Sequence, residues 1–377
     1  MSISSQLRYQ WISGTGMVAD ARQRWASAPL RRFPHRVHES PGGALSTAYL
    51  GYPEGLTYIV PYVVEQQAAI TDEWLSTVDR APLTWTGIRK AVARPAADIM
   101  VVGCSRGQAW ELPRSRSLVL PFRMNLLLDV VGDVDAMYKT VSKNERRQFA
   151  NLRKRREWSA EIGTTDADFD FFYERMHLPT MDLRHGEDTR SVAKPIAYRE
   201  LFQRGFVLFV KEGEKRVAGV LVRLEDEDRT VRMRLLGALD GDESHYWSGA
   251  VKAVYYLTME WAAANGCTLI DFAGCDPFPG RGVFQFKRRF HPRAVLPEDH
   301  YRNRRVYFQI ARDTPIVRDF LVATPMFATD EHDRIHAVHF ADSTRPPRTN
   351  IRGDGPGVHA CRTIDLDEFF SDRGNTP

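Results

Sequence analysis

The clearest hydrophobic pattern lies in the second half of the chain. Three runs of β-branched and aromatic residues follow one another with short polar turns between them, which predicts three antiparallel strands. The runs cover residues 206–212, 216–225 and 229–239. In the third run, Val231 and Met233 alternate with Arg232 and Arg234, as in a strand that exposes one face to solvent.

A helix and another strand follow these runs. Between residues 249 and 265 apolar side chains recur at helical spacing, so this segment is expected to form an amphipathic helix. Residues 267–273 then form a short apolar pattern with one charge, Asp271. A helix of this length can serve as a crossover connection, which predicts that the strands on its two sides run parallel.

Less regular patterns predict the other elements. Residues 1–40 are basic and have a partly helical pattern. From about residue 340 the chain is rich in Gly, Pro, Arg and Asp, which predicts a flexible connection. Residues 363–370 are expected to pack back onto the folded protein. Expected strands are 44–51 and 57–65, joined as a hairpin, and 99–103, 118–131 and 305–311. Expected helices are 71–92, 133–158, 166–178 and 195–204, and Ser142 is expected to cap one of them with Glu145.

Residues 266–290, GCTLIDFAGCDPFPGRGVFQFKRRF, contain the last strand of this predicted sheet and several candidate site residues. The strand opens into a Gly/Pro-rich turn and ends in a compact helical pattern, in which Phe286 and Phe290 are i,i+4 neighbours. A strand, a glycine loop and a basic helix can together hold an anionic ligand. An ordinary β-turn-α unit with a solvated Lys/Arg end explains the same pattern equally well.

The order DFAG, a Pro/Gly loop and GVFQFKRRF resembles the signature of the Fem-type peptidoglycan-bridge aminoacyltransferases and of the wider GNAT-fold acyltransferases. The matching aromatic-Lys pair is Phe286 and Lys287, with Phe290 closing, and the resemblance extends from about residue 138 to 314. The resemblance implies a GNAT fold, which is of the α/β class with a mixed sheet (α+β). It also implies two tandem lobes of this fold, the first of them degenerate. In that fold two parallel strands splay apart, and their unpaired backbone groups can bind an amide-containing donor. The expected domains are residues 1–134, 135–320 and 321–377, the last a partly flexible extension.

Composition and charge narrow the setting. The chain has 377 residues, 43% hydrophobic and 27% charged, as in a soluble globular protein. Its four cysteines form no CxxC pair, which favours reduced thiols in the cytoplasm and no zinc site. The most apolar run, residues 118–131, contains Arg123 and Asp129, so no membrane span is expected, and the N-terminus lacks a signal-peptide pattern.

The net charge of +4 is mild, but residues 143–156 carry seven Lys or Arg and one acid. A basic helix face of this kind can bind RNA phosphates, although it is more often a solvated or salt-bridged surface. The candidate RNA-binding residues are Arg146, Arg147, Arg153, Lys154 and Arg155.

The loop DGDESHYWS, residues 240–248, differs from the glycine-rich pyrophosphate loop of acetyl-CoA-dependent GNAT enzymes. Its carboxylates, Asp240, Asp242 and Glu243, would repel a pyrophosphate and attract an amine, although a solvated loop is the simpler explanation for each of them. With Tyr246 and Trp247 they form one part of the candidate substrate-binding set.

Lys287 is the main catalytic candidate, because the resemblance implies that this lysine neutralises tRNA phosphate or the reacting carbonyl oxygen. Asp271 is the second: it would orient the attacking amine or take its proton, or else pair with an arginine as a structural carboxylate. Phe286, Arg281 and Asp276 complete the substrate-binding set, with Arg281 a candidate for an anionic acceptor.

These patterns predict an acyltransferase that moves an aminoacyl group from aminoacyl-tRNA to a small-molecule or peptide amine, without a metal or further cofactor. An acyl-CoA-dependent N-acyltransferase of the same fold is the first alternative, and a non-catalytic RNA- or partner-binding module is the second. The chain lacks the long charged helical hairpin of some Fem proteins, so their tRNA contacts and peptidoglycan acceptor do not carry over. The acceptor, the transferred group and the oligomeric state are not specified by the sequence.

Overall fold

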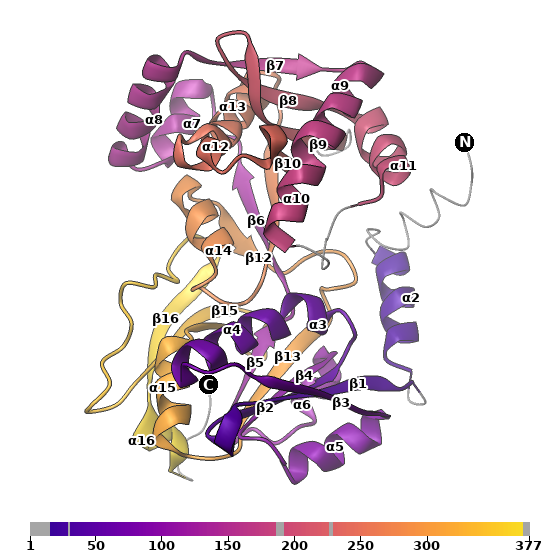
Figure 1. The fold of residues 1–377 in the computed structure, drawn as a ribbon, viewed down its shortest axis with the longest axis vertical. Coiled ribbons are helices and arrows are strands. Elements are labelled where there is room, and N and C mark those ends of the chain that lie inside the picture. Colours follow the sequence, from indigo (N-terminus) through magenta and orange to yellow (C-terminus); the bar gives the residue numbers. More distant parts are fainter. Residues whose placement is uncertain (1–15, 29–30, 186–191, 226–228, 372–377) are drawn as a thin grey trace. The chain divides into compact units, whose positions relative to one another are not determined.

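The computed structural model describes residues 16–28, 31–185, 192–225 and 229–371, arranged as three sheets with helices around them (Figure 1). The chain divides into two compact units. Among the described residues, unit 1 contains 126–273 and 287–292. Unit 2 contains those up to residue 125, residues 274–286 and those from 293 onward. The units are therefore interleaved along the sequence, whereas contiguous domains were expected.

The sheet of unit 1 contains the three strands predicted from the alternating pattern. Its order is β12-β6-β11-β10-β9-β8-β7. The antiparallel ladder is made of β7 (Trp158–Gly163), β8 (Gly205–Glu212), β9 (Lys215–Glu225) and β10 (Thr230–Ala238). The other strands of this sheet are β11 (Leu269–Cys275), β6 (Met124–Asp129) and the edge strand β12 (Arg293–Val295), whose residues are assigned to unit 2. β10 and β11 are parallel, as the predicted crossover requires.

The parallel strands part before either of them ends. Their register runs from Thr230 opposite Leu269 only to Arg232 opposite Asp271. Directly after this point β10 carries a bulge against β9, with Arg234 as the extra residue. A bulge bends and twists its strand, which accounts for the separation from β11. The mixed α/β sheet and the splayed pair expected of the GNAT fold are therefore confirmed.

Helix α13 (Ala250–Ala264) makes the crossover and packs against β8, β9 and β10. The basic segment forms α8 (Lys143–Arg156) after the short α7 (Val134–Thr140). Ser142 caps α8 by accepting from the Glu145 N–H, as predicted. Phe149 of α8 stacks on Tyr256 of α13 with ring centroids 3.8 Å apart, which joins the two helices.

Another helical segment packs against β10. The predicted helix 166–178 is confirmed and extends further, as α9 (Asp166–Phe172), the π-helical turn η2 (Tyr173–His177) and α10 (Leu178–His185). A β-carbon added at Gly237 of β10 would lie 2.5 Å from the Met176 carbonyl carbon, so only glycine allows this approach. The predicted helix 195–204 is present as α11 (Lys194–Ile196), η4 (Ala197–Leu201) and η5 (Phe202–Arg204).

The main sheet of unit 2 has the order β3-β1-β2-β4-β13-β5. Its strands are β1 (Phe33–Glu39), β2 (Ser46–Gly51), β3 (Ser76–Leu83), β4 (Ile99–Ser105), β5 (Ser117–Pro121) and β13 (Arg304–Ile310). Its helices are α2 (Gly16–Ala26), α3 (Gly55–Tyr58), α4 (Val60–Thr71), α5 (Trp85–Ala93), α6 (Arg106–Trp110) and α15 (Pro315–Ala323). The expected strand 305–311 is thus present as β13, which lies between β4 and β5.

Two predictions for this region are wrong. The hairpin 44–51/57–65 does not form, because β2 pairs with β1 and residues 60–71 form α4, which has Pro61 in its first turn, where proline favours a helix. The expected helix 71–92 contains β3, an exposed edge strand, before α5. An apolar run without strict alternation does not distinguish a buried helix from a strand, which explains the first error.

A third sheet, β14-β15-β16, follows α15. It consists of β14 (Met326–Thr329), β15 (Ile335–Ala341) and β16 (Val358–Asp365), and α16 (Leu366–Phe370) follows it. The flexible connection expected from residue 340 is therefore partly wrong, while the docking of residues 363–370 is confirmed by the burial of Leu366 and Phe369. Among the helices of the described residues, none is both long and apolar enough to span a bilayer.

Candidate functional site

Asp271 lies at the point where β10 and β11 part and is 2% exposed. One carboxylate oxygen accepts from the Arg232 guanidinium at 3.0 Å, and the other accepts from the Ala273 N–H at 2.8 Å. Arg232 also pairs with Glu225 at 3.2 Å. Because both oxygens of Asp271 are engaged, the geometry favours the structural alternative over a proton-accepting role.

The bond from Asp271 to the Ala273 N–H stabilises a turn. Ala273 has a φ of +63°, a left-handed conformation that is uncommon for residues with a β-carbon. An aspartate that accepts from the N–H two residues on supports such a turn. Between them, the Phe272 carbonyl accepts a hydrogen bond from Lys287 Nζ at 2.5 Å. The end of β11 therefore holds the Lys287 ammonium group.

Lys287 is the last residue of α14 (Gly282–Lys287) and is 7% exposed, so it is not the surface lysine that the alternative explanation required. Its neighbour Phe286 is half-buried. Phe290, in η7 (Arg288–Phe290), stacks on Tyr255 at 5.0 Å and meets Phe272 edge-on at 5.8 Å. These rings pack beside the residues that hold Lys287 and fix the turn after β11.

The β10 side of the gap differs from the expectation of free backbone groups. His177 Nδ1 donates to the Leu236 carbonyl at 3.1 Å, and Thr180 Oγ1 accepts from the Ala238 N–H at 2.9 Å. Burial lowers the pKa of His177, so its ring is a neutral donor at pH 7. The backbone groups at these two positions of β10 are therefore already hydrogen-bonded to protein side chains, which compete with an amide-containing donor for them.

The acidic loop is more ordered than the polar loop expected from the sequence. It forms η6 (Leu239–Gly241) and α12 (Ser244–Trp247). Asp240 makes a bidentate pair with Arg175 at 2.7 and 2.9 Å, which lowers the pKa of that carboxyl. Asp242 accepts from the Ser244 N–H at 2.8 Å. Both acids thus have structural roles.

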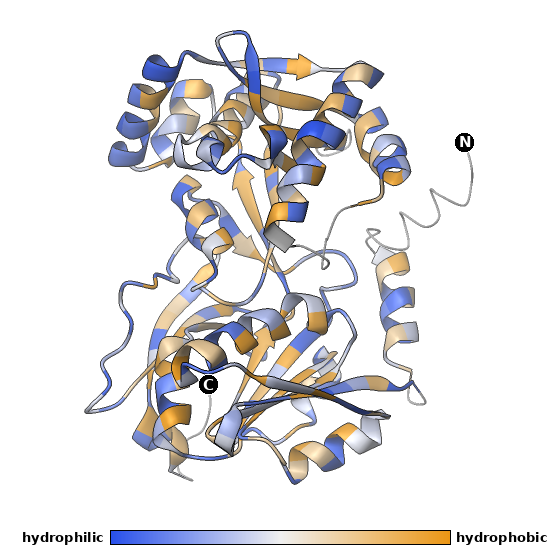
Figure 2. Ribbon diagram, viewed as in Figure 1, coloured by the Kyte–Doolittle hydropathy of each residue, from blue (hydrophilic) through white to orange (hydrophobic). Residues whose placement is uncertain are grey.

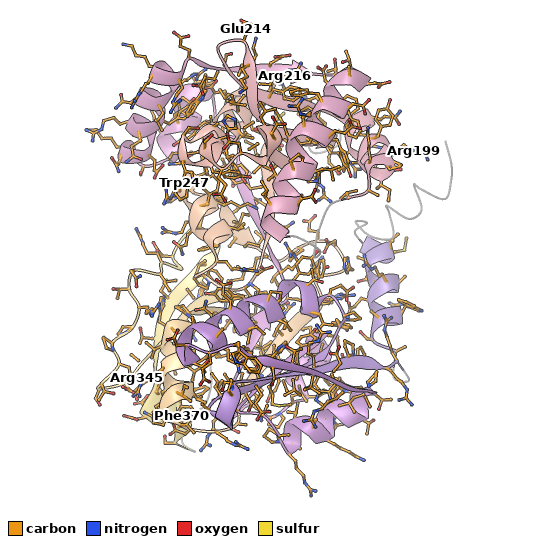
Figure 3. All side chains as sticks on the ribbon, in the orientation of Figure 1. Arg199, Glu214, Arg216, Trp247, Arg345 and Phe370 are labelled. Carbon is orange, nitrogen blue, oxygen red and sulfur yellow. The ribbon has the colours of Figure 1, made fainter. Side chains whose placement is uncertain are left out.

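The other candidates in this loop vary in exposure. Trp247, labelled in Figure 3, is 85% exposed. Glu243 is also exposed, whereas Tyr246 is half-buried. Whether Asp242, Glu243, Tyr246 and Trp247 bind substrate stays a prediction.

A cationic cluster surrounds Glu145 near the start of α13, where Gly249 precedes the helix at a φ of +89°. Lys252 Nζ lies 2.6 Å from the Glu145 carboxylate, and Arg289 Nη1 lies 3.6 Å from it. The Nε of Arg146 is buried, and no described residue accepts its proton. Sequence reasoning missed Lys252 and Arg289, although the position of Lys252 in the first turn of a predicted helix was a usable signal.

The basic helix is only partly available to a ligand. Arg153 is ion-paired with Glu260, and Arg156 pairs with Glu212 at 3.1 Å. Arg147, Lys154 and Arg155 are exposed, and α8 is the most continuously hydrophilic helix of its unit (Figure 2). Three of the five predicted RNA-binding residues are thus exposed, whereas Arg153 is committed to an internal pair and Arg146 is half-buried.

Asp276 and Arg281 lie in unit 2 and meet each other. Asp276 is 8% exposed and accepts from Arg123 and from Arg281, each at 3.3 Å. Arg123 stacks over the Tyr58 ring at 4.0 Å. The structure thus pairs two predicted site residues with each other and adds Arg123, which the sequence showed only as a charge in an apolar run.

Comparisons with protein-family models and with curated proteins found no match. Among solved structures, the chain is similar to L-PGS from Bacillus licheniformis, with 9% identity, a TM-score of 0.37 and coverage of 85% of this chain and 95% of that one. FemX has 10% identity, a TM-score of 0.39 and coverage of 82% and 97%. A GCN5-related N-acetyltransferase from Kribbella flavida has 12% identity, a TM-score of 0.28 and coverage of 83% and 97%. It is the chain's own strand order, with β10 and β11 parallel and then splayed, that identifies the GNAT fold.

Proposed function

We propose that this chain is a Fem-like acyltransferase that moves an aminoacyl group from aminoacyl-tRNA to an amine. The amine nitrogen attacks the ester carbonyl carbon, and the carbonyl π electrons move to the oxygen. Collapse of this oxyanion breaks the bond to the tRNA 3′ oxygen. The nitrogen loses one proton and the 3′ oxygen gains one, so an amide and a free tRNA hydroxyl result.

The observation that carries this proposal is the placement of the Lys287 ammonium. It is buried and oriented by the Phe272 carbonyl at the end of β11, next to the residues where β10 and β11 part. An ammonium group combines a full positive charge with N–H donors, and a developing oxyanion is stabilised by both. A cation in a site shielded from water stabilises such an oxyanion far better than one in bulk solvent.

The polynucleotide part of the donor fits the distribution of cations in unit 1. Lys252, Arg289 and Arg146 outnumber the single carboxylate of Glu145. The exposed cations of α8 continue the same charge along the surface of that helix. Phosphodiesters need such cations, which displace their counterions on binding.

The test of this donor is the salt dependence of tRNA binding. Changing Lys154 and Arg155 together to Ala should weaken binding at low salt and reduce the slope of log K against log salt by about 1 to 2, because two phosphate contacts are lost. Fluorescence anisotropy with labelled tRNA at several salt concentrations measures this slope. Arg153 is not a suitable target, because its ion pair with Glu260 makes it structural.

The matched control is the double change of Arg89 and Lys90, an exposed adjacent pair on α5 in unit 2, to Ala. It removes the same charge and should leave the slope unchanged. If both double variants shift the slope equally, binding is a response to net charge and α8 has no specific role. Absence of tRNA binding at low salt would remove the proposed donor.

The acyl-CoA alternative makes a separate prediction. Because side chains of His177 and Thr180 occupy backbone groups of β10, and because exposed acids precede α13, CoA and acetyl-CoA should bind weakly or not at all. Isothermal titration calorimetry measures this directly. A micromolar dissociation constant for either compound would favour the acyl-CoA-dependent reaction over the tRNA-dependent one.

A further inference from the structure

Helix α2 of unit 2 is anchored through the side of the helix that carries Gln23. Gln23 donates to the Tyr52 hydroxyl at 2.8 Å and accepts from Arg304 Nε at 3.0 Å. Ala19 and Ala26 are buried on the same side of the helix. These contacts determine which face of α2 points away from unit 2.

That outward face is apolar. Met17, Ala21 and Trp25 follow one another at spacings of four residues, which places them on one stripe opposite Gln23. Met17 is 89% exposed and Trp25 is 62% exposed. A surface helix normally turns charged residues outward, so an exposed apolar stripe with a methionine and a tryptophan points to a binding surface.

Arginines surround this stripe. Arg24 lies beside it on the helix, and the Arg31 guanidinium stacks over the Trp25 ring at 4.3 Å. Arg32 is exposed one residue further on. Between residues 16 and 32 the sequence has four arginines and one acid, Asp20.

The other strongly exposed tryptophans among the described residues have the opposite surroundings. Trp74, 75% exposed, follows Asp72 and Glu73, and Trp247 follows the acidic loop with Asp242 and Glu243. The combination of an exposed tryptophan with a cationic rim is thus particular to α2 within this set. The occupant of the surface should therefore present an apolar layer beneath negative charges.

We propose that α2 docks on the surface of an anionic lipid bilayer. Met17 and Trp25 would enter the boundary between headgroups and acyl chains, where a tryptophan ring is favoured, while Arg24, Arg31 and Arg32 pair with lipid phosphates. This contact is peripheral, because an eleven-residue helix lies in the interface without crossing it. It does not depend on the proposed transferase function.

The test uses the full chain and sedimentation with vesicles. The protein should bind vesicles of phosphatidylcholine mixed with phosphatidylserine and should bind vesicles of phosphatidylcholine alone much more weakly. Changing Trp25 to Ser should lower the partition coefficient about tenfold through lost apolar burial. Changing Arg24 to Ala should lower it about fivefold, and only at low salt.

The control is Trp74→Ser, which removes a still more exposed tryptophan in acidic surroundings and should leave partitioning unchanged. Both tryptophan variants should be folded, because both side chains are exposed, and thermal melting verifies this. Equal partitioning of wild type and Trp25→Ser would overturn the proposal. So would self-association that depends on Trp25 without any vesicle binding, because the occupant would then be a second copy of this chain.

Discussion

Replacing Lys287 with methionine should slow single-turnover aminoacyl transfer about a hundredfold or more, because the cation that stabilises the oxyanion is lost. Methionine keeps most of the apolar stem, so the packing of α14 should survive. The Phe272 carbonyl loses its Lys287 donor, so the free energy of unfolding should fall by about 1 to 3 kcal/mol, which thermal melting measures. Transfer and melting should be measured on the same preparation.

Two further variants distinguish catalysis from structure. Lys287→Arg should restore activity only in part, because a planar guanidinium does not fit where a compact ammonium sat. Arg288→Met, one residue on and half-buried, is the matched control and should have a mild effect on the rate. If Lys287→Met melts normally and transfers at the wild-type rate, Lys287 has no role in the reaction.

Gly237→Ala should destabilise unit 1 more than any surface change. Its β-carbon would lie 2.5 Å from the Met176 carbonyl carbon and 2.7 Å from the His177 nitrogen. Both are backbone atoms, so η2 has to move away from β10, at a cost of about 3 kcal/mol. The shift should also lengthen the His177 and Thr180 bonds to β10, and differential scanning calorimetry measures the loss of stability.

Gly107→Ala is the control for this change. Nothing lies within 4 Å of the β-carbon added at Gly107, in α6, so this substitution should be neutral or slightly stabilising. A Gly237→Ala protein that melts with the wild type would mean that η2 does not approach β10 as closely as described. Tighter CoA binding by this variant would instead identify the occupied backbone groups of β10 as the barrier to that donor.

Local signals account for the elements that sequence reasoning predicted. The Ser142 cap and the periodicity of α13 are both encoded within a few residues, and the crossover made by α13 implied that β10 and β11 are parallel. Residues 57–65 were misassigned because nothing nearby shows that β2 already has β1 as its partner. Elements whose conformation depends on a distant partner are beyond such reasoning.

The same distinction between local signals and distant partners applies to the candidate site. The residue types at Asp271 and Lys287 were identified from their surrounding motif, but their contacts were not. Arg232 lies 39 residues before Asp271, and the acceptor of the Lys287 bond is a main-chain carbonyl. Only the folded chain shows that Asp271 is paired with Arg232 and that Arg153 is paired with Glu260.

The position of β13 has a consequence for synthesis of the protein on the ribosome. In its sheet, the edge strand β5 has β13 as its one neighbour, and β13 pairs with β4 on its other side. This part of the sheet therefore cannot form until residue 310 has left the exit tunnel. Roughly 190 residues separate the end of β5 from the end of β13, which corresponds to about 10 to 40 s of translation. Throughout that interval the nascent chain exposes two apolar strand edges, and a chaperone that binds extended segments would have its substrate there.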